Sequence, residues 1–561
     1  MNSKISFLPL SGMDEKYNNS YCLEINDDIF IFNAGIDALI DNKLGISKIV
    51  PDYSYLVKNK DKIKGIFIGT PTYENFGSLP MLLDKIGFDT PIFTSEIGKK
   101  IIENLFEKQF KITNKTLNFQ VLNYLKDFQL NGLTFTAFKI ANSIPYSCGF
   151  VIKTPQGAIV FLDDYLVLNE QSLPFHSQLL NLKDILKGQQ VLLLVTKTGL
   201  VNEVNNFTAP SHSIKSFYEK IMTNTDERII IGCNANDIYN IVSISQLCKK
   251  FQKPLIIYSR NFIDIFKSLI RTNIINQKGL LLLPPTEINK SKNAVVLIIG
   301  SNDYLMNKLS RLHKDEDKNL KLREKDNFIV NIFRKPGYEL PISAILDNIS
   351  RLNVNTFTLA KTIKPLQAGN EDHKLLSSLL KPKYIIPIGG LYKSQIQYSD
   401  LIQETWVTKD KILILENGEF ARFENSELLK IKNDSIKLTQ QYTGANQNDI
   451  EPSTLYERQQ MSENGVICVN LTLKKVEKNV EILNLSISDY GIINYNDSMS
   501  KTLLDEIKAD ARENILGSVS FLKNNQIDFS ETKIGIKKLI IKKFERKLKK
   551  RPIISTIVTV I

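Results

Sequence analysis

The sequence predicts an α/β protein with more than one domain. Short apolar runs bounded by Gly, Asn, Asp or Pro alternate with segments of helical periodicity, which is typical of this class. The length of 561 residues is too great for one compact core and suggests roughly three to four domains of ordinary size. The apolar fraction of 43% and the charged fraction of 24% are those of a globular protein, and they exclude global disorder and fibrous repeats.

Two patterns of elements follow one another along the chain. Isolated strands are predicted first, at residues 5–8, 29–32, 66–68 and 150–152. From Gly188 strands and helices alternate, at residues 191–195, 214–221, 229–231, 241–251, 255–258 and 262–270. This alternation predicts a parallel sheet with crossover helices.

A polar stretch at residues 440–453 is interpreted as a linker to a carboxyl-terminal unit. Near the end of that unit, Ile541, Phe544 and Leu548 form an apolar stripe on an otherwise basic helix. An alternating pattern at residues 553–561 predicts a final strand.

Composition limits the class of protein further. The net charge of +12 favours an anionic partner such as nucleic acid, although a solvated lysine-rich surface explains it equally well. No apolar run approaches the length of a membrane span, and the amino terminus lacks a secretory signal, so a cytoplasmic protein without membrane association is expected. The five cysteines are scattered and are expected to be free thiols.

Specific motifs then resemble those of the ribonuclease J family, and the resemblance covers nearly the whole chain. In chain order the matching segments are residues 11–15, 27–35, 66–80, 142–145, 163–165, 380–390, 456–466 and 551–554. Taken in the same order, the first three resemble the family's Gly-Met-Asp-Glu turn, its strand that ends in Asp-Ala-Gly, and its metal-binding loop. In the second of these, Asn33 replaces the family's Asp. The next three resemble the family's His-Ser-Ile-Pro, Gly-Asp-Phe and Lys-Pro-Lys with His-Gly motifs, and the last two resemble its appended carboxyl-terminal domain.

The resemblance implies the fold. It is a metallo-β-lactamase αββα sandwich with an inserted β-CASP α/β domain and a small α+β carboxyl-terminal domain. The expected boundaries are 1–205 and 355–440 for the sandwich, 206–354 for the β-CASP domain, 441–453 for the linker and 454–561 for a carboxyl-terminal assembly domain.

The resemblance also implies two zinc ions, which activate a hydroxide that attacks an RNA phosphodiester. Zinc takes imidazole, thiolate or carboxylate ligands. The family's ligand positions hold other side chains here, namely Thr70, Thr72, Glu74, Asn75, Asn142, Asp164 and Gly389. Only Asp164 keeps the family's residue, so no metal and no catalytic residue is expected. Glu74 with Asp164 remains a candidate for weak binding of one hard cation.

Histidine placement supports this expectation. The four histidines, His176, His212, His313 and His373, are well separated, and none falls at a ligand position. His373 follows closely after the segment that resembles the family's Ser-Gly-His motif, and it is expected on a helix surface rather than at a metal.

Four residues are candidates for RNA binding: Arg260, Gly300, Ser301 and Gln367. Arg260 is retained beside the segment that replaces the family's Phe-Ala-Ser-Asn-x-x-Arg. Backbone amides at Gly300 and Ser301 are candidates to cradle a phosphate, although an ordinary strand-to-helix turn explains them too. Gln367 stands where the family's Ser-Gly-His has its imidazole.

The sequence therefore favours a non-catalytic subunit that assembles with an active ribonuclease J paralogue in RNA decay or rRNA maturation, as a homo- or hetero-oligomer, with RNA as a further partner. One alternative is a residual metal-dependent 5′-3′ exo- or endoribonuclease that relies on Glu74 and Asp164. The other is a stand-alone RNA-binding scaffold, whose affinity would fall steeply with salt.

Overall fold

The computed structural model describes residues 3–561 except 16, 39–43, 109, 111, 113–114, 168–172, 209–213, 332–337, 360–362, 430–433, 445–448, 477–478, 493–497, 519 and 522–526. It forms two compact units. The first comprises residues 1–40 and 48–441, and the second comprises residues 41–47 and 442–561. His212 lies outside the described residues.

Two mixed sheets form most of the first unit. The first has the order β22-β21-β1-β2-β3-β6-β7-β8, with bounds β22 (Glu427–Leu429), β21 (Ala421–Glu424), β1 (Lys4–Ser11), β2 (Ser20–Ile25), β3 (Asp28–Phe32), β6 (Ile63–Ile68), β7 (Ile92–Thr94) and β8 (Phe119–Val121). The second has the order β20-β13-β12-β11-β10-β9, with bounds β20 (Tyr384–Ile388), β13 (Val191–Lys197), β12 (Gly157–Leu162), β11 (Cys148–Thr154), β10 (Leu133–Lys139) and β9 (Asp127–Leu130).

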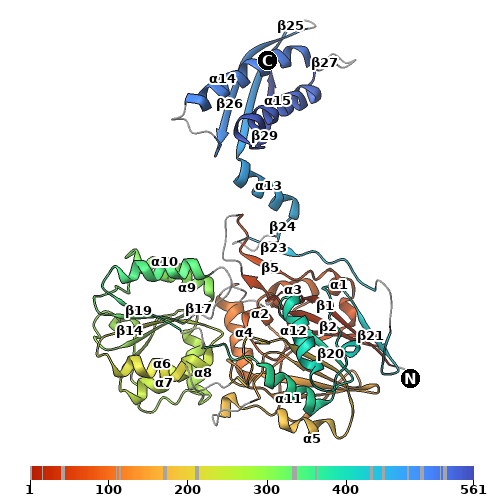
Figure 1. Ribbon diagram of the computed structural model, residues 1–561, viewed down its shortest axis with the longest axis vertical. Helices are drawn as coiled ribbons and strands as arrows, with labels where there is room; N and C mark the ends of the chain where they lie inside the picture. Colours follow the sequence, from red (N-terminus) through yellow and green to blue (C-terminus); the bar gives the residue numbers. More distant parts are fainter. Residues whose placement is uncertain are drawn as a thin grey trace. The chain divides into compact units, whose positions relative to one another are not determined.

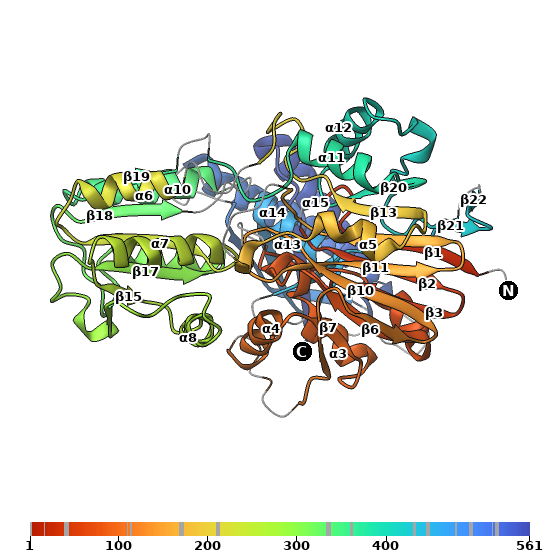
Figure 2. The ribbon, with the colours of Figure 1, turned by 90° about the horizontal axis from the view of Figure 1, so that it is seen from below.

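These sheets pack face to face and helices cover their outer faces (Figure 2). Between the sheets lies an aromatic core, in which Phe32, Phe67 and Phe161 stack. A second core lies under the first sheet against α1 (Ser54–Lys58), α3 (Leu79–Ile86) and α4 (Glu96–Lys108). A third lies under the second sheet against α5 (Leu182–Leu186), α11 (Asn370–Leu380) and α12 (Tyr392–Gln403). This is the αββα sandwich that the resemblance implies.

A six-stranded parallel sheet forms the rest of the first unit, in the order β16-β15-β17-β14-β18-β19. Its strands are β14 (Ile229–Asn234), β15 (Leu255–Ile257), β16 (Leu282–Leu283), β17 (Val295–Gly300), β18 (Asn327–Asn331) and β19 (Asn355–Thr358). Its helices are α6 (Ile214–Thr223), α7 (Ile238–Lys250), α8 (Ile263–Arg271), α9 (Asn302–His313) and α10 (Glu339–Ser350).

The helices of this sheet divide between its two faces (Figure 1). Residues of α6, α7 and α8 share one core, and residues of α9 and α10 share the other. The predicted parallel sheet is therefore confirmed from β14 onward. The strand β13 was expected to begin it, but β13 pairs with β12 and β20 of the sandwich instead. Strand pattern alone does not reveal which sheet a buried strand joins.

The second unit contains α13 (Pro452–Asn464) and a three-stranded sheet in the order β26-β25-β29. The strands are β26 (Asn479–Tyr490), β25 (Val466–Val476) and β29 (Ile553–Val560), and the sheet packs on α14 (Ser498–Ser518) and α15 (Ser530–Leu548). The predicted final strand is confirmed. On α15 the buried stripe is Ile536, Ile540 and Phe544, and the expected stripe residue Ile541 is only half-buried.

The stretch interpreted as a linker, residues 441–453, is not uniformly irregular. It contains the short strands β23 (Gln441–Thr443) and β24 (Asp449–Ile450) and the start of α13. No described helix is both long enough and apolar enough to span a membrane.

Candidate functional site

Five of the seven predicted ligand positions come together in the sandwich. Thr70, Asn75, Asn142, Asp164 and Gly389 lie in the segments that follow β6, β10, β12 and β20, and side-chain contacts link them. They are all buried or nearly so. The structure therefore brings these five predicted positions together at one place in the sandwich.

The other two positions contribute differently. Thr72 precedes the short helix α2 (Tyr73–Phe76), and its carbonyl accepts the amides of Asn75 and Phe76. Glu74 accepts a hydrogen bond from Asn236 Nδ2 at 2.9 Å, so it is directed toward the segment after β14. Glu74 and Asp164 each have another polar partner, Asn236 for Glu74 and Lys197 for Asp164.

Asn142 is fully engaged. Its Nδ2 donates to Thr70 Oγ1 at 3.1 Å and to the Asp164 carbonyl at 2.8 Å. Its Oδ1 accepts from the Ile144 amide at 2.8 Å and from Ser147 Oγ at 3.0 Å. The side-chain amide therefore ties two segments of the sandwich together and offers no free acceptor.

Asn75 is engaged in the same way. Its Nδ2 donates to the Thr70 carbonyl at 2.9 Å, and its Oδ1 accepts from Asn19 Nδ2 at 2.9 Å. A second donor to that oxygen is Lys197 Nζ, at 3.3 Å. Because the amide oxygen has two donors, it is not available to a cation.

Lys197 is the residue around which this set is arranged. It ends β13, a strand that is buried along its whole length, and it is 8% exposed. Its Nζ lies 3.2 Å from Asp164 Oδ2 and 3.8 Å from Asp163 Oδ1. A Cβ at Gly389 would stand 3.1 Å from Lys197 Cγ, so the glycine leaves room for the lysine stem. We call Lys197, Asp163, Asp164, Asn75 and Gly389 the lysine centre.

Sequence reasoning did not single out Lys197. The available signal was a charged residue at the end of a buried strand, Val191–Lys197, whose first five residues are apolar, since a buried lysine needs an opposite charge nearby.

Electrostatics support the pairing. Burial opposes charging of Lys197, but Asp164, Asp163 and Glu74 together outweigh it and raise the pKa of the ammonium. Burial raises the pKa of Asp163 to about 6, against the lowering effect of Lys197. Asn33, where the family has an acid, donates from Nδ2 to Asp163 Oδ1 at 2.9 Å. The two carboxylates are thus held by an ammonium and an amide.

These side chains do not fit two zinc ions. Thr70, Asn75 and Asn142 supply amides and a hydroxyl that are already hydrogen bonded, and Gly389 supplies no side chain. Lys197 directs an ammonium at the surviving carboxylate. Within the described residues, no group of three or more His, Cys, Asp or Glu side chains could hold a metal ion. Asp164 Oδ1 is a buried oxygen without a partner in the described part of the chain, and one oxygen does not make a two-metal site.

His373 lies on α11 as expected, but it is buried rather than on the surface. Its Nε2 lies 3.0 Å from the Thr198 carbonyl, and its Nδ1 lies 2.9 Å from Tyr165 Oη. The carbonyl can only accept, so Nε2 carries the proton and Tyr165 donates to Nδ1. Burial lowers the pKa of His373 to about 4. The ring is a neutral packing residue of the sandwich.

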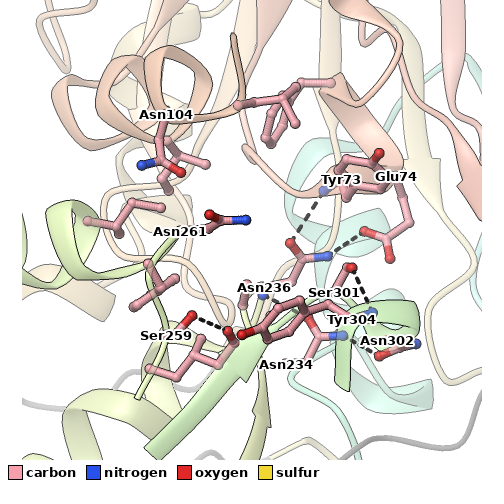
Figure 3. A pocket seen from close by; sticks show the side chains of 18 of the residues that line it. Tyr73, Glu74, Asn104, Asn234, Asn236, Ser259, Asn261, Ser301, Asn302 and Tyr304 are labelled. Atoms are coloured by element: carbon pink, nitrogen blue, oxygen red, sulfur yellow. Dashed lines mark hydrogen bonds between the residues drawn. The ribbon is translucent and has the colours of Figure 1, made fainter. Parts of the chain in front are cut away.

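A cavity of about 260 Å³ lies beside Glu74, at the carboxyl ends of β14, β15 and β17 (Figure 3). We call it the amide cavity, because five asparagines share its lining with other polar side chains: Asn104, Asn234, Asn236, Asn261 and Asn302. Gly300 and Ser301, two of the RNA-binding candidates, also line it. Arg260 is exposed and does not line the cavity, and neither does Gln367.

Much of the cavity wall is fixed by hydrogen bonds. Asn234 Nδ2 donates to Asn302 Oδ1 at 2.5 Å, and Asn234 Oδ1 accepts the Asn236 amide at 2.8 Å. Ser301 caps α9, since its Oγ accepts from the Tyr304 amide at 3.4 Å. The Ser301 hydroxyl is therefore engaged as a helix cap.

Comparisons with known proteins agree with the motifs. The β-CASP domain of ribonuclease J matches residues 226–349, and the ribonuclease J C-terminal domain matches residues 453–561. The chain is 35% identical to Uncharacterized protein MG423 of Mycoplasma genitalium, over the whole of both chains. It is 25% identical to Ribonuclease J 2 of Staphylococcus saprophyticus, over all of this chain and 98% of that protein.

A solved structure is similar in fold. It is a protein of unknown function from Enterococcus faecalis V583, with a TM-score of 0.52 and 13% identity, and the match covers 75% of this chain and all of that one. At this identity the likeness concerns the fold alone.

Proposed function

This chain belongs to the ribonuclease J family, and from that premise we propose that it is a non-catalytic member. It assembles with an active ribonuclease J and supports RNA decay or rRNA maturation without cleaving RNA itself. We infer that its location is the cytoplasm.

The lysine centre carries this proposal. Lys197 Nζ, 3.2 Å from Asp164 Oδ2, supplies one fixed positive charge to the carboxylate that the family uses for metal binding. An ammonium pairs with one oxygen of that carboxylate but cannot activate a water molecule as a zinc ion does. Repulsion between the ammonium and a divalent cation also opposes metal entry. Under this proposal the chain keeps the fold of a nuclease, but its lysine centre does not catalyse RNA cleavage.

A surface suited to a partner lies in the second unit. The strand β29 is at the edge of its three-stranded sheet, so one side of its backbone can pair with another chain. Ile557 on this strand is 58% exposed. Exposed apolar side chains on an edge strand are typical of association by strand addition or face packing.

Co-purification tests the assembly. Tagged full-length chain is expected to recover an active ribonuclease J, and Ile557→Asp is expected to abolish that recovery. Ile534→Asp is the matched control, because Ile534 is exposed to a similar degree, 53%, on α15. Equal recovery by both variants would show that β29 is not the contact. Failure of the unsubstituted chain to recover any ribonuclease J would contradict the proposal.

A second candidate function is RNA binding without a nuclease partner. It is favoured by the row of exposed basic side chains on α15: Lys533, Lys537, Lys538, Lys542, Arg546 and Lys547. Lysine contacts to phosphate make the affinity fall steeply with salt. A chain that recovers RNA but no ribonuclease J, with affinity that collapses between low and moderate salt, would favour this candidate.

Residual catalysis is the remaining alternative, and the unpartnered Asp164 Oδ1 is the observation that favours it. Any metal-dependent cleavage that belongs to this chain should disappear in Asp164→Asn. Cleavage that persists in that variant would come from a contaminating nuclease.

A further inference from the structure

The chain passes twice between the sandwich and the domain that is built on the parallel sheet. It leaves after β13 toward α6, and it returns after β19 toward α11. We call residues 198–208 the outgoing segment and residues 363–369 the return segment. The two segments lie side by side, because the amide of Leu200 donates to the carbonyl of Ala368 at 2.8 Å. A contact that fixes one segment therefore also restrains the other.

Asp372, in the first turn of α11, binds both segments through one buried carboxylate. Its Oδ2 accepts the amide of Thr208 in the outgoing segment and the amide of Gly369 in the return segment, each at 2.9 Å. Its Oδ1 accepts the amide of Val167, in the segment after β12, at 3.0 Å. Capping of its own helix explains only the bond from Gly369. The other two bonds join α11 to remote parts of the chain.

Residues on either side of this carboxylate hold the segments close together. Asn370 Oδ1 accepts the amide of Asn202 at 2.9 Å, and the Asn370 amide donates to the carbonyl of Val204 at 2.9 Å. A Cβ at Gly369 would stand 2.5 Å from the carbonyl oxygen of Asn206, so only a glycine permits this approach. The outgoing and return segments thus form one hydrogen-bonded joint at the amino terminus of α11.

The amide cavity depends on how the two domains are oriented, because both contribute to its wall (Figure 3). Asn236, which follows β14, donates to Glu74 of the sandwich at 2.9 Å across the boundary. A change in orientation would therefore alter the width of the cavity. Lining residues from the sandwich include Tyr73 and Asn104, and those from the parallel-sheet domain include Asn234, Ser259 and Asn302.

We propose that Asp372 is a positioning residue that holds the two segments together and thereby fixes the orientation of the parallel-sheet domain on the sandwich. Hydrogen bonds from amides to a carboxylate are stronger than those between neutral groups, and burial excludes water that could replace them. Movement of either segment would break such a bond, so the segments move together with α11. This role involves neither the lysine centre nor a nuclease partner, and it can fail while the proposed function holds.

Pulsed electron paramagnetic resonance on the full chain measures the orientation. Spin labels are attached at Lys60→Cys in the sandwich and Lys292→Cys in the parallel-sheet domain, two exposed positions. Cys468→Ser is included throughout, because the other four cysteines are buried. With Asp372 present, a single distance between the labels is expected. Asp372→Asn replaces one acceptor oxygen with a donor and is expected to widen the distance distribution at least about twofold. Two distances in the chain that retains Asp372 would overturn the proposal.

The matched control is Glu371→Gln, because Glu371 is the preceding residue and its carboxylate forms a surface ion pair with Lys374. It is expected to leave the distribution unchanged. Asn370→Ala removes the bond to the Asn202 amide and is expected to widen the distribution less than Asp372→Asn does. This variant tests the joint even if Asp372→Asn does not fold. Equal widths in Asp372→Asn and Glu371→Gln, or a loss of stability in Asp372→Asn without widening, would contradict a positioning role.

Discussion

The lysine centre and the amide cavity lie on either side of α2, and they use polar residues in opposite ways. In the lysine centre most polar groups pair with one another: Asn75 and Asn142 are fully hydrogen bonded, and Lys197 pairs with the carboxylates, although Asp164 Oδ1 has no partner in the described part of the chain. In the amide cavity Asn104 and Asn261 face open space. A set of polar groups that is closed on itself supports the fold, whereas a set that faces a cavity can bind a ligand.

This difference separates two properties that an active nuclease combines. Chemistry at the sandwich needs an open coordination position, and we propose that the Lys197 ammonium takes that position. Recognition at the neighbouring sheet needs only shape and hydrogen-bond donors and acceptors, which the cavity retains. Glu74 lines the cavity and also contributes to the raised pKa of Lys197, so substitutions in each region measure how strongly the two are coupled.

The largest effect is expected at Lys197. Lys197→Met keeps the length of the side chain and leaves Asp163 and Asp164 buried without an opposite charge, so the free energy of unfolding should fall by about 3 to 5 kcal/mol. Urea denaturation at pH 7 measures it. The control is Lys383→Met, which breaks the exposed pair with Glu427 and should cost less than about 1 kcal/mol. Similar losses in the two variants would show that the centre does not depend on its ammonium.

A smaller loss is expected from Asn33→Asp. This change replaces the donor to Asp163 Oδ1 with a carboxylate, so two acceptors face each other and stability should fall by roughly 1 to 3 kcal/mol. The matched control is Asn26→Asp, because Asn26 shares the left-handed backbone of Asn33 (φ 58° and 67°) and is exposed. Thermal or urea unfolding of both variants measures the difference. If the stability of Asn33→Asp were unchanged, Asp163 would not need the amide donor that Asn33 provides.

A pH effect is expected from His373, whose pKa of about 4 is below its ordinary value. Between pH 4 and about 6.5 the unfolded chain binds a proton that the folded chain does not bind. The stability present above that range is therefore lost as pH falls, and this residue should account for about 2 kcal/mol by pH 5. His373→Gln should flatten the pH dependence between 7.5 and 5 by that amount. If stability depended on pH equally in His373→Gln and in the unsubstituted protein, the ring of His373 would not titrate as a buried base.

The smallest effect is expected at the wall of the amide cavity. Ser301→Ala removes the cap of α9 and should lower stability by about 1 kcal/mol, without changing metal uptake at the sandwich. Thermal unfolding and metal analysis measure the two quantities. A change in metal uptake would show that the two regions are coupled.

Much of the fold could be predicted from the sequence. The strands at β1, β3, β6 and β11 were visible as short apolar runs, and the alternation that gives the parallel sheet was visible from β14 onward. Ordered motifs located the centre of the sandwich. These features depend on local patterns, or on matches that need no knowledge of three-dimensional contacts.

The pairing of charges could not be predicted, because it depends on contacts between distant residues. Lys197 meets Asp164 and Asn75 only once the sheets have packed. In the same way Arg228 forms a buried ion pair with Asp326. His373 is buried against Tyr165, although the sequence pattern of its helix is amphipathic and predicted a surface position. The amide cavity was missed because its asparagines come from four separate segments.

The most direct test of the central claim is metal content, measured by mass spectrometry on untagged protein, together with cleavage of a 5′-monophosphorylated RNA with and without manganese or zinc. The account predicts less than about 0.1 metal equivalents per chain and no cleavage, because the lysine centre offers no coordination site. About two equivalents with metal-dependent cleavage would contradict it.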